Sequence, residues 1–414
     1  MRFGANYTPK VGWFHSWLDL DIAEVERDFE ALKALGLDHV RIFPLWPLLQ
    51  PNRTLIRPRA IADVGAVVDA AHRQGLETWV DVLQGHLSSY DFLPSWVSTW
   101  HESNIFTNPD VVSGQRALLA ALAAELRGRP GAAGLCLGNE IGQFAAPRHP
   151  HAASLDSAEA GAWLHAMMDE SELAWPESPT VHCFDDDLWF VPEHPFEPAH
   201  AVDFGAMTTV HSWVFMQVGP RYGEKHPALT RFARYLCELA TAWNVHRGRA
   251  QRPVWLHEIG APAPVVSEAD APAFLDASLR NVEDLAGLWG VTWWCSHDVS
   301  RSLADFPELE YSLGLLDSSG KVKGIGQAFA EYIADYKSRS FSGAEGGAQG
   351  AVASLSNTPA TAFHVEGART VERPVLEVPS AAARRAELSP SGEIFDTWLR
   401  LWDNHGTPPT LKLS

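Results

Sequence analysis

The sequence is poor in cysteine, with four among 414 residues. Their spacing fits neither a zinc-binding motif nor a disulfide framework. We therefore expect reduced and buried thiols, as is usual for a chain of the cytoplasm. The His149-Pro150-His151 pair has no further ligands at metal-site spacing, so we also expect no bound metal. The cysteines are Cys136, Cys183, Cys237 and Cys295.

Several targeting and cofactor signals are missing as well. No apolar run approaches the length needed to cross a bilayer, and the first residues lack the basic-then-apolar pattern of a secretion signal. No glycine-rich phosphate loop of either common form is present. We expect a cytoplasmic protein with no membrane partner and no cofactor.

Basic residues are also scarce relative to acidic ones. The chain has 32 Lys and Arg against 51 Asp and Glu, a formal net charge of −19. Such a charge disfavours binding of nucleic acids or anionic membranes and suits a small neutral substrate. A homo-oligomer is compatible with the sequence, which leaves the oligomeric state open.

The chain does contain regularly alternating strand-like and helix-like segments, the pattern of repeated βα units. Eight strands close a parallel barrel, and eight apolar runs are found. These runs are 3–7, 39–44, 78–83, 134–139, 180–184, 208–212, 254–258 and 291–296. Amphipathic helices are expected at 22–35, 60–74, 110–127, 157–173, 227–246, 271–285 and 325–337.

The predicted fold is therefore an α/β protein, a (β/α)8 TIM barrel over residues 1–340. Glycine, alanine and serine dominate residues 341–352, which we interpret as a connection. Short apolar runs at 362–365, 375–378 and 395–402 predict a small β-rich segment over residues 353–414, packed on the barrel.

Two glutamates stand at the ends of predicted strands. Asn139-Glu140 ends the fourth strand and His257-Glu258 ends the seventh. Barrel enzymes hold their catalytic groups at this end of the strands. Two carboxylates about 5–5.5 Å apart cleave glycosidic bonds with retention, one as acid and base and the other as nucleophile. Arg41, on the second strand, can keep a nucleophile ionised.

These residues resemble those of clan A glycoside hydrolases, most closely family five, over about residues 1–338. The resemblance implies that Glu140 is the acid/base and Glu258 the nucleophile. It places Arg41, Asn139, His211 and a strand-eight tryptophan, Trp293 or Trp294, around the substrate. One departure is His211-Ser212-Trp213, because the family often has a tyrosine two residues after this histidine, as a donor to the nucleophile. Trp213 stands there instead.

A closer resemblance lies in several loop motifs, which are similar to those of actinobacterial family-five β-mannosidases acting on mannosyl-β-1,4-N-acetylglucosamine. This resemblance implies a retaining, exo-acting β-mannosidase with a small oligosaccharide substrate. We expect Trp13, His15, Trp46, His86 and, from its position after the eighth strand, Asp298 to bind substrate. The motifs are Asn6-Tyr-Thr-Pro9, Gly12-Trp-Phe-His-Ser-Trp17, Arg41-Ile-Phe-Pro-Leu-Trp46, Gln50-Pro-Asn-Arg53 and Gln84-Gly-His-Leu-Ser-Ser89.

Other interpretations stay open. An endo-acting β-mannanase or β-glucanase of the same family would need an open groove. A non-catalytic carbohydrate-binding barrel would not need both glutamates, and a lyase or isomerase would usually show a lysine or metal ligands at strand ends. Each of the 17 tryptophans can fill the core as readily as stack on a sugar. The run Asp185-Asp186-Asp187 is expected to be a solvated loop.

Overall fold

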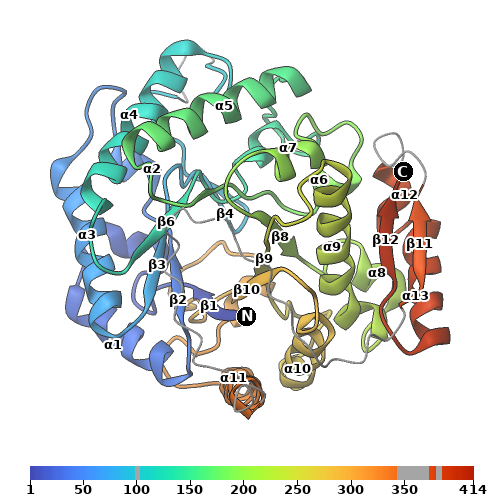
Figure 1. The fold of residues 1–414 in the computed structure, drawn as a ribbon. Coiled ribbons are helices and arrows are strands. Elements are labelled where there is room, and N and C mark those ends of the chain that lie inside the picture. Colours follow the sequence, from blue (N-terminus) through green and yellow to red (C-terminus); the bar gives the residue numbers. More distant parts are fainter. Residues whose placement is uncertain (98–102, 343–372, 379–384) are drawn as a thin grey trace.

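The computed structural model of the chain describes residues 1–97, 103–342, 373–378 and 385–414. Its centre is an eight-stranded parallel sheet in the order β7-β6-β3-β2-β1-β10-β9-β8. The predicted barrel is confirmed, and Figure 1 shows helices arranged around it. The strands are β1 (Arg2–Asn6), β2 (His39–Ile42), β3 (Glu77–Asp81), β6 (Ala132–Cys136), β7 (Thr180–Val181), β8 (Thr208–Ser212), β9 (Val254–Ile259) and β10 (Leu288–Trp293).

The barrel is nearly closed, because β7 is only two residues long and does not pair with β8 along its length. Two hydrogen bonds bridge this seam. The backbone N–H of Ala206 donates to the carbonyl of Thr180 at 2.8 Å, and the Thr209 hydroxyl donates to the carbonyl of His182 at 2.7 Å. These hydrogen bonds therefore join β7 and β8 where regular strand pairing is absent.

All seven expected helices are present, with ends shifted by a few residues. They are α1 (Ile22–Ala34), α3 (Pro58–Arg73), α4 (Pro109–Leu126), α5 (Ser157–Ala174), α9 (Pro227–His246), α10 (Ala271–Val282) and α11 (Gly324–Ser342). Local sequence explains several starts, since the side chains of Asp21, Asn108 and Asp156 accept hydrogen bonds from the first-turn N–H groups of α1, α4 and α5.

Short elements in the loops were not expected from the sequence. The hairpin β4 (His86–Leu87) and β5 (Tyr90–Asp91) follows the third barrel strand. The others are α2 (Trp46–Leu49), α6 (Asp187–Phe190), α7 (Pro198–Asp203), α8 (Val218–Tyr222) and the 3₁₀ helices η1 (Trp13–Leu18), η2 (Ile141–Ala145) and η3 (Glu308–Ser312). Each is too short for a periodic pattern to develop.

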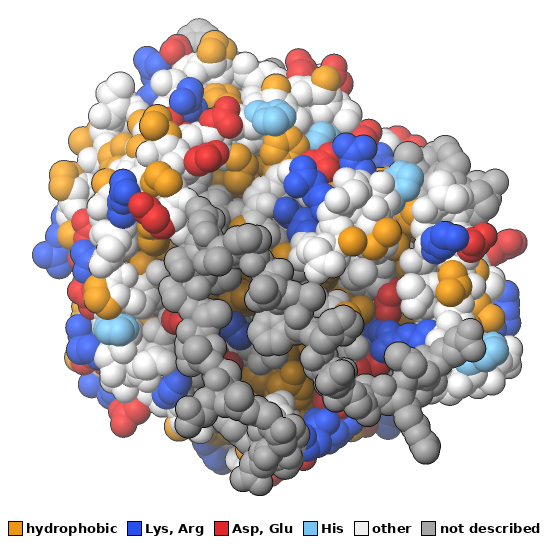
Figure 2. All heavy atoms as spheres, viewed as in Figure 1, with side chains coloured by type: hydrophobic (Ala, Val, Ile, Leu, Met, Phe, Trp, Pro, Cys, Tyr) orange, Lys and Arg blue, Asp and Glu red, His pale blue; other side chains and the backbone are white. Residues whose placement is uncertain are grey.

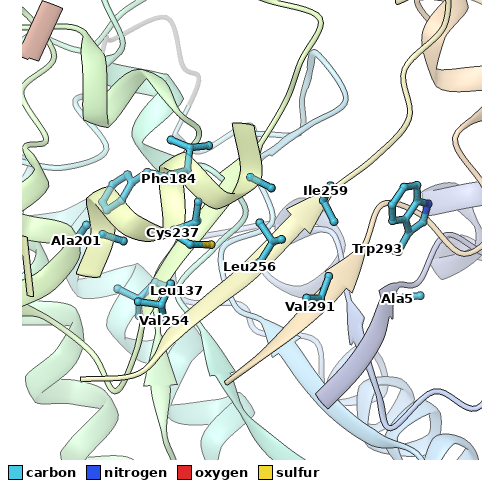
Figure 3. Close-up of a cluster of buried hydrophobic side chains, with 14 of the residues drawn as sticks. Ala5, Leu137, Phe184, Ala201, Cys237, Val254, Leu256, Ile259, Val291 and Trp293 are labelled. Atoms are coloured by element: carbon cyan, nitrogen blue, oxygen red, sulfur yellow. The ribbon is translucent and has the colours of Figure 1, made fainter. Parts of the chain in front are cut away.

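Apolar side chains fill the space between strands and helices. Figure 3 shows Leu256 of β9 and Val291 of β10 beside Cys237 of α9 and Ala5 of β1. The barrel interior is filled by Trp79, Trp255 and Trp289, whose rings lie 4.4–5.7 Å apart although β3 and β9 are not neighbours in the sheet. This layer forms a rigid floor under the carboxyl ends of the strands.

The described residues of the C-terminal part are not β-rich, contrary to expectation. Within the described residues it has the parallel strands β11 (Val375–Val378) and β12 (Thr410–Leu413), but also the helices α12 (Arg385–Leu388) and α13 (Glu393–His405). The run 395–402 belongs to α13, because Phe395, Trp398, Leu399 and Trp402 recur with helical rather than strand spacing. Two predicted segments lie outside the described residues: the run 362–365 and most of the connection 341–352. Residues 341 and 342 of that connection form the end of α11.

Side chains of α13 pack against α9 of the barrel. The ring of Phe395 lies 4.8 Å from that of Tyr235, whose hydroxyl donates to the carbonyl of Leu388 at 2.7 Å. Phe395 and Trp398 are fully buried, and each such side chain contributes roughly 1.5–3 kcal/mol of hydrophobic stabilisation. The segment is thus part of the barrel's own core packing.

Within the described residues, no helix has the length and apolar character needed to cross a membrane. On the face shown in Figure 2, acidic and basic side chains lie interspersed.

Candidate active site

Arg41 lies at the centre of the carboxyl end of the barrel and is completely buried. Its Nε and Nη2 donate to the two carboxylate oxygens of Asp81, at 2.7 and 2.9 Å. Its Nη1 donates to Glu258 Oε1 at 3.0 Å, and its Nη2 also donates to Asn139 Oδ1 at 2.8 Å. One guanidinium therefore holds side chains from the carboxyl ends of three different strands.

Asp81 was missed by the sequence reasoning, although the signal was present. It ends the apolar strand β3 as Glu258 ends its own strand. Asn6, at the end of β1, was missed in the same way; its Oδ1 accepts from Arg41 Nη1 at 3.2 Å. Both support Arg41 rather than facing the cavity.

We predict that removing this cation destabilises the fold. Arg41→Met leaves the carboxylates of Asp81 and Glu258 buried without their partner, and breaking a buried ion pair costs about 3–5 kcal/mol. Denaturant unfolding monitored by tryptophan fluorescence measures the loss. Arg27→Met, which removes the exposed pair with Glu24, serves as the control and leaves the midpoint unchanged. Equal midpoints for the two variants would contradict the central role of Arg41.

Glu140 and Glu258 face each other across His211. One carboxylate oxygen of each and Nδ1 of His211 all lie within 4.8 Å of one another. His211 Nδ1 is 2.7 Å from Glu140 Oε1 and 3.4 Å from Glu258 Oε2. These oxygens lie closer together than the roughly 6.5–9.5 Å that separates the carboxyl groups of inverting glycosidases.

Trp213 takes the place of the tyrosine that the family often has. Its indole Nε1 donates to Glu258 Oε2 at 3.3 Å. Glu258 thus accepts from Trp213 on one oxygen and from Arg41 on the other. Neither group can accept a proton from it, so both favour the ionised carboxylate.

The two glutamates can share one proton near neutral pH, because the pKa of Glu258 is raised and that of Glu140 is lowered. Burial raises the pKa of Glu258 to about 7, an effect that His211 and Arg41 oppose and the carboxylate of Glu140 strengthens. Burial also acts to raise the pKa of Glu140, but the hydrogen bond and charge of His211 lower it. These shifts alone would place the shared proton on Glu258. We place it on Glu140, because His211 Nδ1 can accept a hydrogen bond whereas Arg41 and Trp213 only donate.

The backbone and a second histidine hold this arrangement. Glu140 has the left-handed backbone angle φ of 44°, which is uncommon outside glycine and turns its side chain away from the strand direction. His211 Nε2 lies 3.0 Å from His257 Nδ1, and burial, with Arg41, lowers the pKa of His257 so that its ring stays neutral. His211 is thereby held in one orientation.

A cavity of about 400 Å³ opens above the pair. Of the residues predicted to bind substrate, it is lined by His86, Asn139 and Trp294, together with both glutamates and with Trp213, which we also expect to contact the sugar. Its walls come from the loops after five strands, and Glu310 of η3 and Arg148 are lining residues that the sequence did not single out. A cavity of this size suits a small oligosaccharide.

Other predicted residues lie away from the cavity. Trp46 and Trp293 are fully buried, and their indole N–H groups donate to Gln50 Oε1 at 2.9 Å and to the carbonyl of Leu313 at 3.3 Å. Both pack in the core, which corrects the expectation that they contact substrate. Trp13 is buried against Phe306, with ring centroids 4.4 Å apart.

His15 and Asp298 are also outside the cavity lining. His15 is exposed, and its ring lies 6.1 Å from that of Phe92. Asp298 accepts from Lys323 Nζ at 2.9 Å and from the backbone N–H of Gly314 at 2.8 Å, which is a structural role. The expectation that Asp298 binds sugar is therefore not supported by its position.

The expected solvated loop at 185–187 is wrong, because all three aspartates are buried. Asp185 and Asp186 line the cavity, and Asp187 begins α6. Arg148 pairs with Asp185, and its Nε lies 2.9 Å from Asp187 Oδ2. The sequence shows only a run of charge, whereas the structure supplies the cation that allows its burial.

Among the described residues, three groups contain side chains of metal-ligand type within reach of one another. In two of these groups a guanidinium already pairs with a carboxylate: Arg41 with Glu258, and Arg148 with Asp185. The third consists of Cys183, His211 and His257, and burial raises the pKa of the Cys183 thiol. The expectation of a metal-free site stays a prediction.

Solved structures of subfamily 18 of glycoside hydrolase family 5 match the whole chain. The enzyme from Streptomyces cattleya, in a glutamate-to-alanine variant with mannosyl-β-1,4-N-acetylglucosamine, is 45% identical with a TM-score of 0.89, covering 100% of this chain and 94% of that one. A similar variant complex from Bifidobacterium longum subsp. longum is 39% identical with a TM-score of 0.87, covering 100% and 91%.

A more distant structure, the exo-β-1,4-mannosidase of Opitutaceae bacterium strain TAV5, shares the fold at 22% identity, with a TM-score of 0.68 over 82% of this chain and 60% of that one. No protein-family model and no curated protein matches the chain. Full-length identity of 39–46% to the subfamily 18 structures nevertheless shows that the chain is a glycoside hydrolase and belongs to subfamily 18 of family 5.

Proposed function

We propose that the protein is a retaining, exo-acting β-mannosidase that hydrolyses mannosyl-β-1,4-N-acetylglucosamine. The observation that carries this proposal is the pair Glu140 and Glu258, with carboxylate oxygens within 4.8 Å at the floor of the cavity. The disaccharide is the ligand named for two of the similar structures. The protein would act in the cytoplasm on a small, imported or released sugar.

In the first step, the ionised Glu258 attacks the anomeric carbon while Glu140 gives its proton to the departing oxygen. A covalent mannosyl-enzyme forms and N-acetylglucosamine leaves. In the second step, Glu140 takes a proton from water, which attacks the same carbon and releases mannose with its β configuration. Asn139, held by Arg41, is positioned to donate through Nδ2 to a sugar hydroxyl beside the reacting carbon.

Exo action is supported by the way one end of the cavity is built. Ser88, beyond β4, donates to Glu310 Oε2 at 3.0 Å, which ties the β4–β5 hairpin to η3. On its other side, Asp91 of β5 lies 3.0 Å from both His86 and His149. The hairpin, fastened to η3 and to His149, forms part of the cavity wall, and such a wall would favour a short substrate over a polymer chain.

Hydrolysis of four substrates by the purified protein tests the proposal. The panel is mannosyl-β-1,4-N-acetylglucosamine, mannobiose, cellobiose and mannan, with the first product anomer followed by NMR. We expect preferential cleavage of the first substrate, with β-mannose appearing before mutarotation. Cleavage inside mannan or of cellobiose would indicate an endo-acting enzyme, and binding without cleavage would indicate a carbohydrate-binding barrel.

A further inference from the structure

Asp185, Asp186 and Arg148 line the cavity, and Asp187 pairs with Arg148 beside them; these four residues are here called the aspartate wall. Two of its carboxylates have partners, since Arg148 contacts both Asp185 and Asp187 and Gln143 also donates to Asp185. Because the guanidinium stands where a cation would bind, this wall suits a neutral ligand better than a metal ion.

Asp186 differs from its neighbours. It is 3% exposed and lines the cavity, yet its Oδ2 has no hydrogen-bond partner among the described residues. A buried carboxyl oxygen without a partner is unfavourable, and a hydroxyl or amide N–H of a bound molecule would satisfy it. Burial, strengthened by Asp187 and opposed by Arg148, raises the pKa of Asp186 to about 8, so the group can also donate.

The position of the wall relative to the two glutamates indicates which sugar it would meet. Gln143, which contacts Asp185, belongs to η2, the helix that begins directly after Glu140. Under the proposed mechanism, Glu140 protonates the oxygen of the departing sugar, so that sugar lies on the side of Glu140. Glu310, which hydrogen-bonds with Trp294, is affected more strongly by the charge of Glu258 than by that of Glu140.

An apolar rim also lines the cavity. Phe215 and Met216 follow β8, and Met216 is 44% exposed. An N-acetylhexosamine combines an amide N–H and hydroxyls with an apolar ring face and a methyl group. The cavity offers carboxyl groups and apolar side chains to match both kinds of surface.

We propose that Asp186 of the aspartate wall determines specificity for the departing sugar by hydrogen-bonding an N-acetylhexosamine, with Phe215 and Met216 against its apolar parts. This inference rests on the proposed function, since it assumes that the sugar on the side of Glu140 is the leaving group.

The test compares two substrates that differ only in the leaving group, mannosyl-β-1,4-N-acetylglucosamine and 4-nitrophenyl β-mannoside. In Asp186→Ala, the ratio of kcat/KM for the disaccharide to that for the aryl mannoside should fall at least tenfold, and in Asp186→Asn by less. The control is Glu310→Gln, which removes another buried carboxyl group that lines the cavity. This variant should lower kcat/KM for both substrates and leave the ratio of the two values near that of the wild type. An unchanged ratio in Asp186→Ala would overturn the inference.

Product inhibition gives a second readout that does not depend on the disaccharide. N-acetylglucosamine should inhibit aryl mannoside hydrolysis by the wild type, and its inhibition constant should rise at least tenfold in Asp186→Ala, while that of mannose changes far less. Equal changes for both sugars, or loss of N-acetylglucosamine inhibition after chelator treatment, would overturn it. If the wild type cleaves neither mannoside, the proposed function itself fails, which is a distinct outcome.

Discussion

Glu258→Gln is expected to lower kcat by about 10⁴-fold or more, because loss of a nucleophile removes the covalent route altogether. The amide keeps the size of the side chain and can still accept from Arg41, so the fold should survive. Initial rates on mannosyl-β-1,4-N-acetylglucosamine measure the effect. In Glu258→Gly, added azide should occupy the vacated space and yield α-mannosyl azide, which identifies the face that Glu258 attacks.

A matched control is available in Glu238 of α9. It is also buried and paired with an arginine, its Oε1 lying 2.7 Å from Arg234 Nη2, but it does not line the cavity. Glu238→Gln should reduce stability and leave kcat close to the wild-type value. A comparable loss of kcat in both variants would show that the effect at position 258 is structural.

Glu140→Gln is expected to lower kcat/KM for the disaccharide by about 10²–10⁴-fold, the usual contribution of general acid catalysis. The loss should be much smaller for dinitrophenyl β-mannoside, whose leaving group needs no proton. Deglycosylation then becomes limiting, and azide should restore turnover by forming β-mannosyl azide. Equal losses for both substrates would argue against Glu140 as the acid.

The pH profile follows from the shared proton. The active form has one proton on the pair, so kcat/KM should fall at low pH, where Glu258 is protonated, and again above about 7, where the last proton leaves. Glu140 is already neutral in the active form, so replacing it with glutamine leaves the charge beside Glu258 unchanged across the acid limb. In Glu140→Gln with the dinitrophenyl substrate, the alkaline limb should therefore disappear while the acid limb stays near its wild-type pH.

The sequence was informative where a single rule links position to chemistry. Apolar strands that end in a polar residue identified Glu140 and Glu258, because parallel strands of a barrel bring their carboxyl ends together. The same rule could have identified Asp81 and Asn6. The rule works because a strand buried on both faces is apolar along its length, so the polar residue that ends it is visible in the local sequence.

Tryptophan positions were less predictable. Trp46 and Trp294 both follow barrel strands, yet Trp46 is enclosed by the core and Trp294 lines the cavity. The orientation of such a ring depends on loops that follow other strands. The residues next to the tryptophan in the sequence carry no information about those loops. Asp186 illustrates the same limit, because the burial of its neighbours depends on Arg148, almost forty residues away in the chain.

Arg385 of α12 has a consequence for how the chain can be divided. Its guanidinium donates to the backbone carbonyls of Leu188, Pro192, His194 and Phe196, the stretch that directly follows the aspartate wall. A change of composition near residue 340 therefore does not mark the end of the catalytic unit. Truncation near residue 340 would remove the support of a loop that faces the substrate. Substitutions in the last thirty residues can therefore change substrate selectivity without any change in the residues that line the cavity.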